Sequence, residues 1–250
     1  NQTISPNGIL SSDKLIEGSG NINHQLYRAI TSVQSNNVYT LSLFAKKAER
    51  NVIQIGVGGT SFLEGSIYVN FDLTNGSIGN GNYLDAKIDM LQNDWYKCSV
   101  SFTTISTSNF NVTIQPKLTS SSSRNLAYQG DGTSGIYIWG AQLEEQSYAT
   151  SYIPTEGSTV TRNQDVCING GSLASINSTE GVLYAEIAAL ANSGTYRSVS
   201  LSNGTNANRV NLTYSTASNI LLGFINVNGV NTSFTFTVNP ITDFVKCALK

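Results

Sequence analysis

GDGTSGIYIWGAQLEEQSYATSYIPTEGSTVTRN, residues 130–163, reads as a strand, a turn-rich exit and the entry to a second unit. Strict alternation over residues 136–143 assigns one face to Ile136 and Ile138, and the other to Tyr137, Trp139, Ala141 and Leu143. Both faces are largely apolar, which is typical of a strand inside a sheet, with one face on the core and the other partly covered by loops. We therefore expect Trp139 to be a packed core aromatic.

Similar patterns recur on both sides of this stretch. In Trp95–Thr103, the clearest example, the predicted inward side chains are Tyr96, Cys98, Val100 and Phe102. Further strands are predicted at residues 39–45, 52–57, 67–71, 110–114, 182–189, 196–201, 209–214, 220–227, 230–238 and 244–249. Asn75-Gly76 and Asn228-Gly229 predict tight turns between strands. No helix longer than one or two turns is predicted.

The chain is therefore predicted to be all-β, with two tandem β-sandwich domains. After Pro154 the sequence becomes rich in glycine and small polar residues. We place the first domain at residues 1–161, a linker at 162–169 and a second domain at 170–250. About 80 residues with unpaired strand edges form a marginal domain. We expect this second sandwich to be incomplete, with further chain or a partner covering its edges.

The string GDGTSGIYIWGAQLEEQSYATSYIPT, residues 130–155, resembles the end of a jelly-roll module of bacteriophage tail fibre and receptor-binding proteins, related to carbohydrate-binding modules and concanavalin A-like lectins. YTLSLFAKKAERNVIQIG from Tyr39, FDLTNGSI from Phe71 and NDWYKCSVSFT from Asn93 fit the same family pattern. The resemblance covers roughly the first two thirds of the chain. It implies that the first domain is a jelly roll and that the sequence is a fragment of a longer protein. The second domain resembles, more weakly, a concanavalin A-like or laminin-G-like sandwich.

The resemblance also implies a setting. It implies a non-enzymatic tail fibre module of the virion, assembled in the bacterial host cytoplasm and binding bacterial surface polysaccharide. Other virion tail proteins are the further expected partners, and trimers are the expected oligomer. Two alternatives stay open: a purely structural spacer or decoration domain, and an accessory module of a glycan depolymerase.

Charge and composition exclude several partners. The net charge is −2, from 14 basic and 16 acidic residues, so no basic field favours nucleic acid or an anionic membrane. No apolar run approaches the roughly 20 residues of a membrane helix, and we expect no membrane insertion. The three cysteines, Cys98, Cys167 and Cys247, form no CxxC pair and are interpreted as buried free thiols.

Catalytic and metal-binding patterns are weak. His24 is the only histidine, and we interpret it as an exposed residue at a strand start. The acids Asp85 and Asp89, and the pair Glu144-Glu145, have no specific spacing for glycoside hydrolysis and are interpreted as solvated. The string Ile138-Trp139-Gly140-Ala141 lacks the acids that accompany calcium in related modules. We therefore predict no catalytic residue, metal or cofactor.

The predicted ligand-binding residues lie in loops rather than in a motif. Tyr83 borders a turn-rich segment, while Tyr128, Gln129 and Asp131 lie, with Arg124, between the serine-rich run and the strand at residue 135. Aromatic faces stack on sugar rings, and amides or acids hydrogen-bond to hydroxyl groups. The alternative for residues 119–134 is a solvated connection without a ligand.

Overall fold

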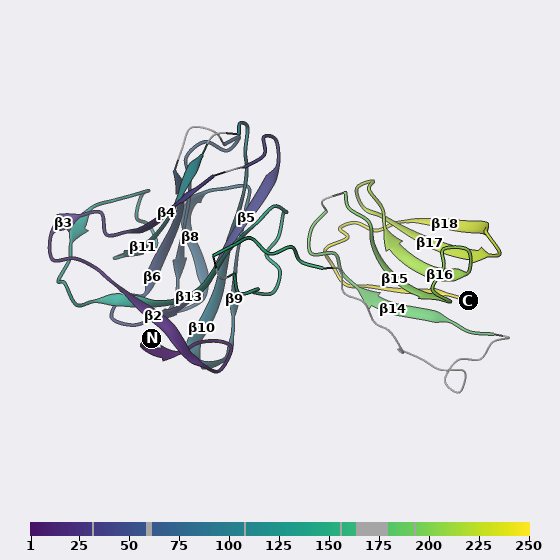
Figure 1. The fold of residues 1–250 in the computed structure, drawn as a ribbon, viewed down its shortest axis with the longest axis horizontal. Helices are drawn as coiled ribbons and strands as arrows, with labels where there is room; N and C mark the ends of the chain where they lie inside the picture. Colours follow the sequence, from purple (N-terminus) through teal and green to yellow (C-terminus); the bar gives the residue numbers. More distant parts are fainter. Residues whose placement is uncertain (32, 59–61, 108, 156, 164–179, 193) are drawn as a thin grey trace. The chain divides into compact units, whose positions relative to one another are not determined.

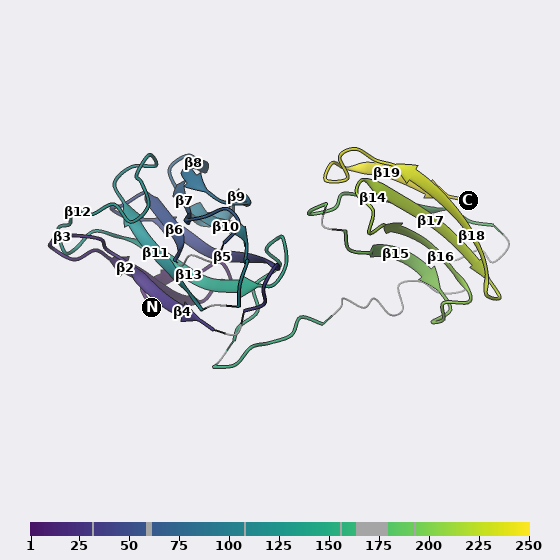
Figure 2. The ribbon, with the colours of Figure 1, turned by 90° about the horizontal axis from the view of Figure 1, so that it is seen from above.

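The computed structural model describes residues 1–31, 33–58, 62–107, 109–155, 157–163, 180–192 and 194–250. The chain divides into two compact units, Asn1–Val160 and Thr161–Lys250, each built from antiparallel strands (Figures 1 and 2). The predicted all-β sandwich class is confirmed. Within the described ranges the only helix is a single 3₁₀ turn, Gln92–Asp94. Residues 164–169 of the predicted linker, and Cys167 with them, lie outside the described residues.

Two sheets form the first unit. The six-stranded sheet has the order β1 (Thr3–Ile4), β2 (Leu10–Ile16), β13 (Gly135–Glu144), β5 (Val38–Lys47), β10 (Trp95–Thr103), β9 (Asp85–Met90). The five-stranded sheet has the order β4 (Leu26–Ile30), β11 (Phe110–Lys117), β6 (Val52–Gly58), β7 (Ile67–Asp72), β8 (Ser77–Asn82). A short pair, β3 (Asn21–Ile22) with β12 (Tyr128–Gln129), lies beside them.

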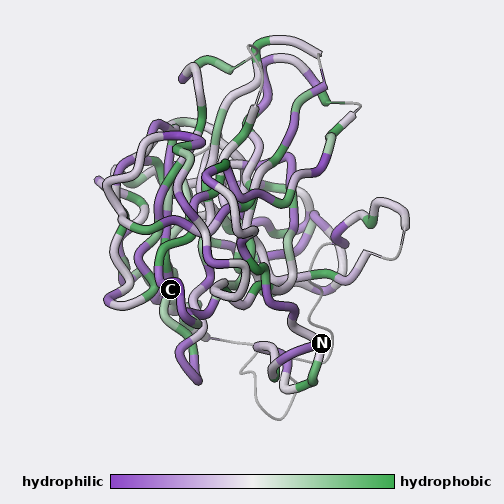
Figure 3. The backbone as a smooth tube through the Cα atoms, turned by 90° about the vertical axis from the view of Figure 1, so that its left-hand side faces the viewer, coloured by the Kyte–Doolittle hydropathy of each residue, from purple (hydrophilic) through white to green (hydrophobic). Residues whose placement is uncertain are grey.

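One continuous core fills the space between these sheets. It joins Leu41, Leu43 and Val100 of one sheet to Ile55, Val69 and Ile114 of the other. All four predicted inward residues of β10 are at most 5% exposed. Hydrophobic and hydrophilic residues alternate along much of the chain in Figure 3, as strands with one face on a core require. The Asn75-Gly76 turn between β7 and β8 is confirmed, with Gly76 at φ +68°.

Strand β13 lies inside its sheet, between β2 and β5, but a bulge interrupts its alternation. Trp139 pairs with Phe44 and Gln142 pairs with Ser42, so β13 has one residue more than β5 over this interval. Gly140 adopts φ +61° at the bulge.

The bulge changes which side chains share a face. Leu143 packs on the core together with Ile136 and Ile138, so its predicted placement with Trp139 is wrong. Trp139 is packed, but outside the core, with ring centroids 5.2 Å from Phe44 and 4.6 Å from Tyr152. The exit segment thus covers this outer face of β13, as the two apolar faces had indicated.

The second unit combines sheets of unequal size. Its four-stranded sheet has the order β15 (Arg197–Ser202), β16 (Arg209–Tyr214), β17 (Ile220–Val227), β18 (Val230–Thr237), and a ribbon pairs β14 (Leu183–Ile187) with β19 (Val245–Leu249). Leu249 of the ribbon packs with Leu212 of the larger sheet. Asn228 and Gly229, both at positive φ, form the predicted turn between β17 and β18.

The ribbon leaves the flanks of the larger sheet's inner face uncovered. Val199 of β15 pairs with buried Leu212 of β16. The same row continues across the sheet to Gly223 of β17 and Phe234 of β18. The exposed apolar side chains on these flanks are 44–49% accessible: Val199, Leu201, Phe234 and Phe236. The predicted unpaired edges are therefore accompanied by an incompletely covered face.

Candidate functional site

The candidate site is the outer face of the five-stranded sheet, which points away from the core. Strand pairing places one residue from each strand in a single row across this face. This tyrosine row consists of Tyr27, Thr113, Gly56, Tyr68 and Asn82, from β4, β11, β6, β7 and β8 in that order. With strands about 4.8 Å apart, its two tyrosines lie roughly 14 Å from each other at the Cα level.

The ends of the tyrosine row are accessible and its centre is closed. Tyr27 is 65% exposed, Tyr68 is half-buried and Asn82 is exposed. At the centre, the Thr113 hydroxyl lies only 2.6 Å from the position that a Cβ of Gly56 would occupy. A side chain at Gly56 would therefore displace Thr113. Because residue 56 is glycine, the sheet surface between Tyr27 and Tyr68 carries no bulky side chain at this position.

The adjacent row on the outer face consists of buried amides. Gln115, Gln54 and Asn70 are fully buried, and Gln54 Nε2 donates to Asn70 Oδ1 at 2.7 Å. Buried amides are stabilised by hydrogen bonds, and each of these three bonds to the loop at residues 118–126, although Gln115 Oε1 has no partner among the described residues. Asn70 Nδ2 donates to Ser122 O at 2.6 Å, and Gln54 Oε1 accepts from Asn125 N at 3.0 Å.

This loop is therefore fastened to the sheet and is not a solvated connection. Gln115 Nε2 donates to Asn125 Oδ1 at 2.6 Å, and Asn80 N donates to Ser120 O at 2.8 Å. The Ser120 carbonyl approaches so closely that a Cβ at Gly79 would lie 2.2 Å from it. Long-range side-chain contacts hold the loop, so its structure could not be inferred from its local composition.

Arg124 is carried by the loop onto the outer face. Its Nε donates to Ile67 O at 3.2 Å and its Nη2 to Val57 O at 3.0 Å, where β6 ends and β7 begins. Nη2 lies 3.3 Å from the position of a Cβ at Gly58, so glycine makes room for the guanidinium. Arg124 is only partly buried, and it has no carboxylate partner among the described residues.

A second cation lies beneath the loop. Lys117 is 1% exposed and its Nζ donates to Leu126 O at 2.8 Å and Asn23 Oδ1 at 3.3 Å. Burial lowers the pKa of Lys117 to about 8 because desolvation disfavours the charged form. With neutral oxygen partners only, this lysine serves to anchor the loop.

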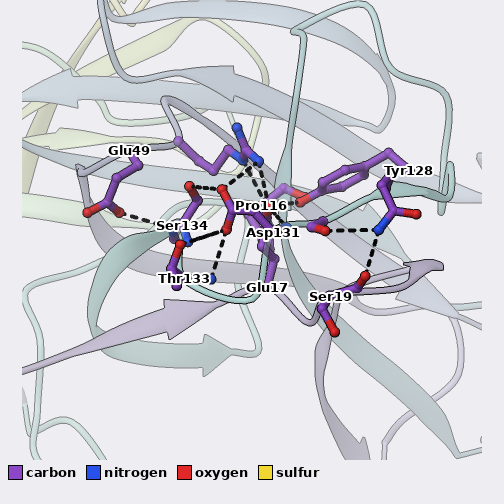
Figure 4. Close-up of polar contacts among 12 residues, drawn as sticks. Glu17, Ser19, Glu49, Pro116, Tyr128, Asp131, Thr133 and Ser134 are labelled. Carbon is purple, nitrogen blue, oxygen red and sulfur yellow. Dashed lines mark hydrogen bonds and ion pairs between the residues drawn. The ribbon is translucent and has the colours of Figure 1, made fainter.

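Tyr128 and Asp131, two of the predicted binding residues, belong to a polar network around Glu17 (Figure 4). The Arg50 guanidinium donates to Glu17 at 2.7 Å and 2.5 Å, and the Tyr128 hydroxyl donates to Glu17 Oε2 at 2.7 Å. The hydrogen bonds from Arg50 chiefly lower the pKa of Glu17 to about 2, against the opposing effect of burial. Asp131 N also donates to Glu17, at 3.0 Å.

The side chains of these candidates are occupied by internal contacts. Tyr128 is 8% exposed and packs edge-on against His24, with ring centroids 4.6 Å apart. Asp131 is exposed, but its carboxylate accepts hydrogen bonds from Ser134 and, to a smaller extent, Thr133, which lower its pKa. Gln129 is exposed and donates to Ser19 O at 2.6 Å. The structure thus brings three candidates together, next to His24 and Glu17.

Tyr83 stands apart from these three residues. It is half-buried and packs against the core beside β8, where its ring lies 2.5 Å from the position of a Cβ at Gly81. The prediction for His24 is wrong: it is 5% exposed rather than solvated. Its Nδ1 accepts from Gly18 N at 3.0 Å, which assigns the proton to Nε2, 3.1 Å from Tyr128 O.

The acids considered for hydrolysis have separate surroundings. Asp85 and Asp89 are exposed on edge strand β9. Glu144 accepts from Thr150 N at 2.9 Å, and Glu145 accepts from the Tyr39 hydroxyl at 3.0 Å. Among the described residues, no group of three or more His, Cys, Asp or Glu could hold a metal ion. In the same ranges, no helix has the length and apolar character needed to cross a membrane.

Comparison with known proteins identifies no family for the chain. No protein-family model matches it, and no curated protein matches it significantly.

Sequence reasoning missed most of this face. No sequence motif distinguishes Tyr27, and Arg124 is indicated only as a neighbour of the loop candidates. The available signal was the pair of glycines at 56 and 58 in β6, opposite an aromatic on the next strand. Glycine inside a strand often marks close approach of another group, and here it makes room for Thr113 and Arg124.

Proposed function

We propose that the first unit is a non-enzymatic glycan-binding module of a phage tail fibre or a related virion protein. The observation that carries this proposal is the tyrosine row, with an exposed Tyr27 and a half-buried Tyr68 on one face of a rigid sheet. Tyr27 and Tyr68 flank a surface of small side chains, and their aromatic faces can stack on sugar rings, which present apolar C–H surfaces. Asn82 and the exposed Asn111 add polar groups at the margin of the same face.

The setting follows from the resemblance of residues 130–155 to tail fibre modules. On this proposal the sandwich is a jelly roll of the concanavalin A-like type, and the ligand is a polysaccharide of the bacterial surface. The protein would act in the virion, beside other tail proteins and as a trimer. It would be assembled in the host cytoplasm.

The binding surface proposed here differs from the loop residues expected from sequence. Tyr128 supports the proposal indirectly, because its hydrogen bond to Glu17 holds the loop region before β13. Its ring packs on His24, so we place sugar stacking at Tyr27 and Tyr68. Gln129 and Asp131 remain candidates for contacts at the edge of the module.

The test is a glycan array of bacterial surface polysaccharides screened with the 1–250 chain. We expect saturable binding that weakens about fivefold in Tyr27→Ala, since an aromatic contact contributes about 1 kcal/mol. Tyr196→Ala is the matched control, because Tyr196 is similarly exposed, at 61%, but lies in the second unit. Its affinity should equal that of the unchanged chain.

Two other results would replace the proposal. A folded chain that binds no glycan would favour the structural spacer. Release of shortened saccharides from a bound polymer would favour the depolymerase alternative, and mass spectrometry of the supernatant would detect it.

A further inference from the structure

From the surroundings of Arg124 we infer that the outer face selects glycans that carry a carboxylate, as in uronic acid residues, and that Arg124 binds this group. The inference rests on the proposed glycan-binding function of the same face. It adds the chemical class of the ligand and a residue that determines specificity.

The Arg124 guanidinium is oriented by two hydrogen bonds to the sheet backbone. Nε and Nη2 donate from one edge to the carbonyls of Ile67 and Val57. The opposite edge, formed by Nη1 and the second hydrogen of Nη2, donates to no described residue. Nη1 has no partner among the described residues and is not buried, so it is open to solvent. An arginine with one edge fixed and one edge free is arranged for bidentate binding of a carboxylate.

The second feature of Arg124 is its charge. Among the described residues Arg124 forms no ion pair, whereas Arg50 and Lys14 in the same unit both contact carboxylates. The residues of the tyrosine row are uncharged, and Gly58 beneath the guanidinium has no side chain. The positive charge of Arg124 is therefore not compensated locally, and an anionic ligand would be attracted to it.

The third feature of Arg124 is its position. Arg124 lies over Gly58, next to Gly56 in the tyrosine row, and its Nε reaches the residue before Tyr68. A sugar ring on Tyr68 would thus hold its substituents near the free edge of the guanidinium. The loop that carries Arg124 is fastened by the buried amides Gln54, Asn70 and Gln115, so the cation is held in place without ligand.

The experiment compares acidic and neutral forms of the same polymers on the full 1–250 chain. The probes are oligosaccharides of polygalacturonic, polyglucuronic and polymannuronic acid, each beside its carboxyl-reduced form, with a glycerol phosphate polymer as another anion. We expect at least one uronic series to bind about tenfold or more tightly than its reduced form. Raising the salt concentration should remove part of that preference.

Variants assign the preference to one residue. Arg124→Gln should abolish the discrimination between acidic and reduced polymer, and Arg124→Lys, which keeps the charge but loses the planar fork, should retain only part of it. Arg28→Gln, an exposed arginine of β4, is the control and should leave the preference unchanged. Thermal unfolding of each variant verifies the fold; if Arg124→Gln is unfolded, Arg124→Lys alone decides.

Failures of the two proposals can be told apart. Equal binding of acidic and reduced polymers, still weakened by Tyr27→Ala, would overturn the role of Arg124 and leave the glycan-binding function standing. Binding of the glycerol phosphate polymer alone would replace the carboxylate by a phosphate ligand. The absence of binding to any glycan, on the array or in this series, would overturn both.

Discussion

In the first unit a six-stranded sheet covers a five-stranded sheet, whereas in the second a two-stranded ribbon covers a four-stranded sheet. Among the described residues, the first arrangement gives one core from Val33 to Ile136, and the second gives two small clusters, around Leu221 and Leu212. The size of each core depends on how much of each sheet another layer covers.

The largest expected difference between the units is in thiol accessibility. Cys98 is 0% exposed and burial raises its pKa, whereas Cys247 is only partly buried and donates to Ala185 O. In a Cys167→Ser background, Cys98 should be labelled at least about a thousandfold more slowly than in the denatured chain, because labelling requires opening of the core. Cys247 should show much weaker protection. Peptide mass spectrometry after timed labelling measures both, and similar protection would contradict the comparison.

Core truncations should show the next largest difference. Phe71→Ala in the first unit should cost about 3–5 kcal/mol, and Leu212→Ala in the second about 2–3 kcal/mol, because the small cluster around Leu212 can relax more easily than the large core around Phe71. Both tryptophans, Trp95 and Trp139, belong to the first unit, so their fluorescence reports its unfolding separately. Circular dichroism follows the unfolding of strands in the second unit, which has no tryptophan. A greater loss for Leu212→Ala would refute the expected order.

Acid should weaken the first unit through Glu17. The pKa of Glu17 is about 2 in the folded chain, below its ordinary value of 4.5, so its contribution is complete above about pH 5 and is lost as the pH falls towards 2. The shift corresponds to roughly 3 kcal/mol. Denaturant titrations followed by tryptophan fluorescence between pH 2 and 7 test this. Glu17→Gln should be less stable at pH 7 and lose less on acidification; an unchanged acid slope would count against the network.

The smallest expected effect concerns the open flank of the second unit. Phe234→Ser and Phe236→Ser should each change its stability by no more than about 0.5–1 kcal/mol, because both rings are almost half exposed. Together they should reduce binding of an apolar fluorescent dye. Val199→Ser on the other flank is a matched variant. Unchanged dye binding in all three would mean that this face is not the exposed apolar surface.

Sequence reasoning succeeded where each residue depends on its immediate neighbours. The period of two predicted the inward residues of β10, and Asn228-Gly229 predicted the last turn, because both are local properties. It failed where one residue shifts the register. The extra residue at Gly140 returned Leu143 to the core, and no alternation rule detects such a bulge.

The candidate site was harder to predict because its contacts are distant in sequence. Tyr128 meets Glu17 across 111 residues, and Gln54 meets Ser123 across 69. A serine-rich loop with few apolar residues gives no sign that buried amides on three strands will hold it. Tyr27 and Tyr68 share a row only through the pairing of β4, β11, β6 and β7.

The fastening of residues 118–126 to the buried amides also bears on the entropy of recognition. When a loop becomes ordered only on ligand binding, the loss of its conformational entropy reduces the affinity. Here that freedom is already lost when the chain folds, through hydrogen bonds from Gln54, Asn70 and Gln115. If the outer face binds glycans as proposed, it is a preorganised surface, and the rate of ligand association should be limited by diffusion and orientation instead of loop closure.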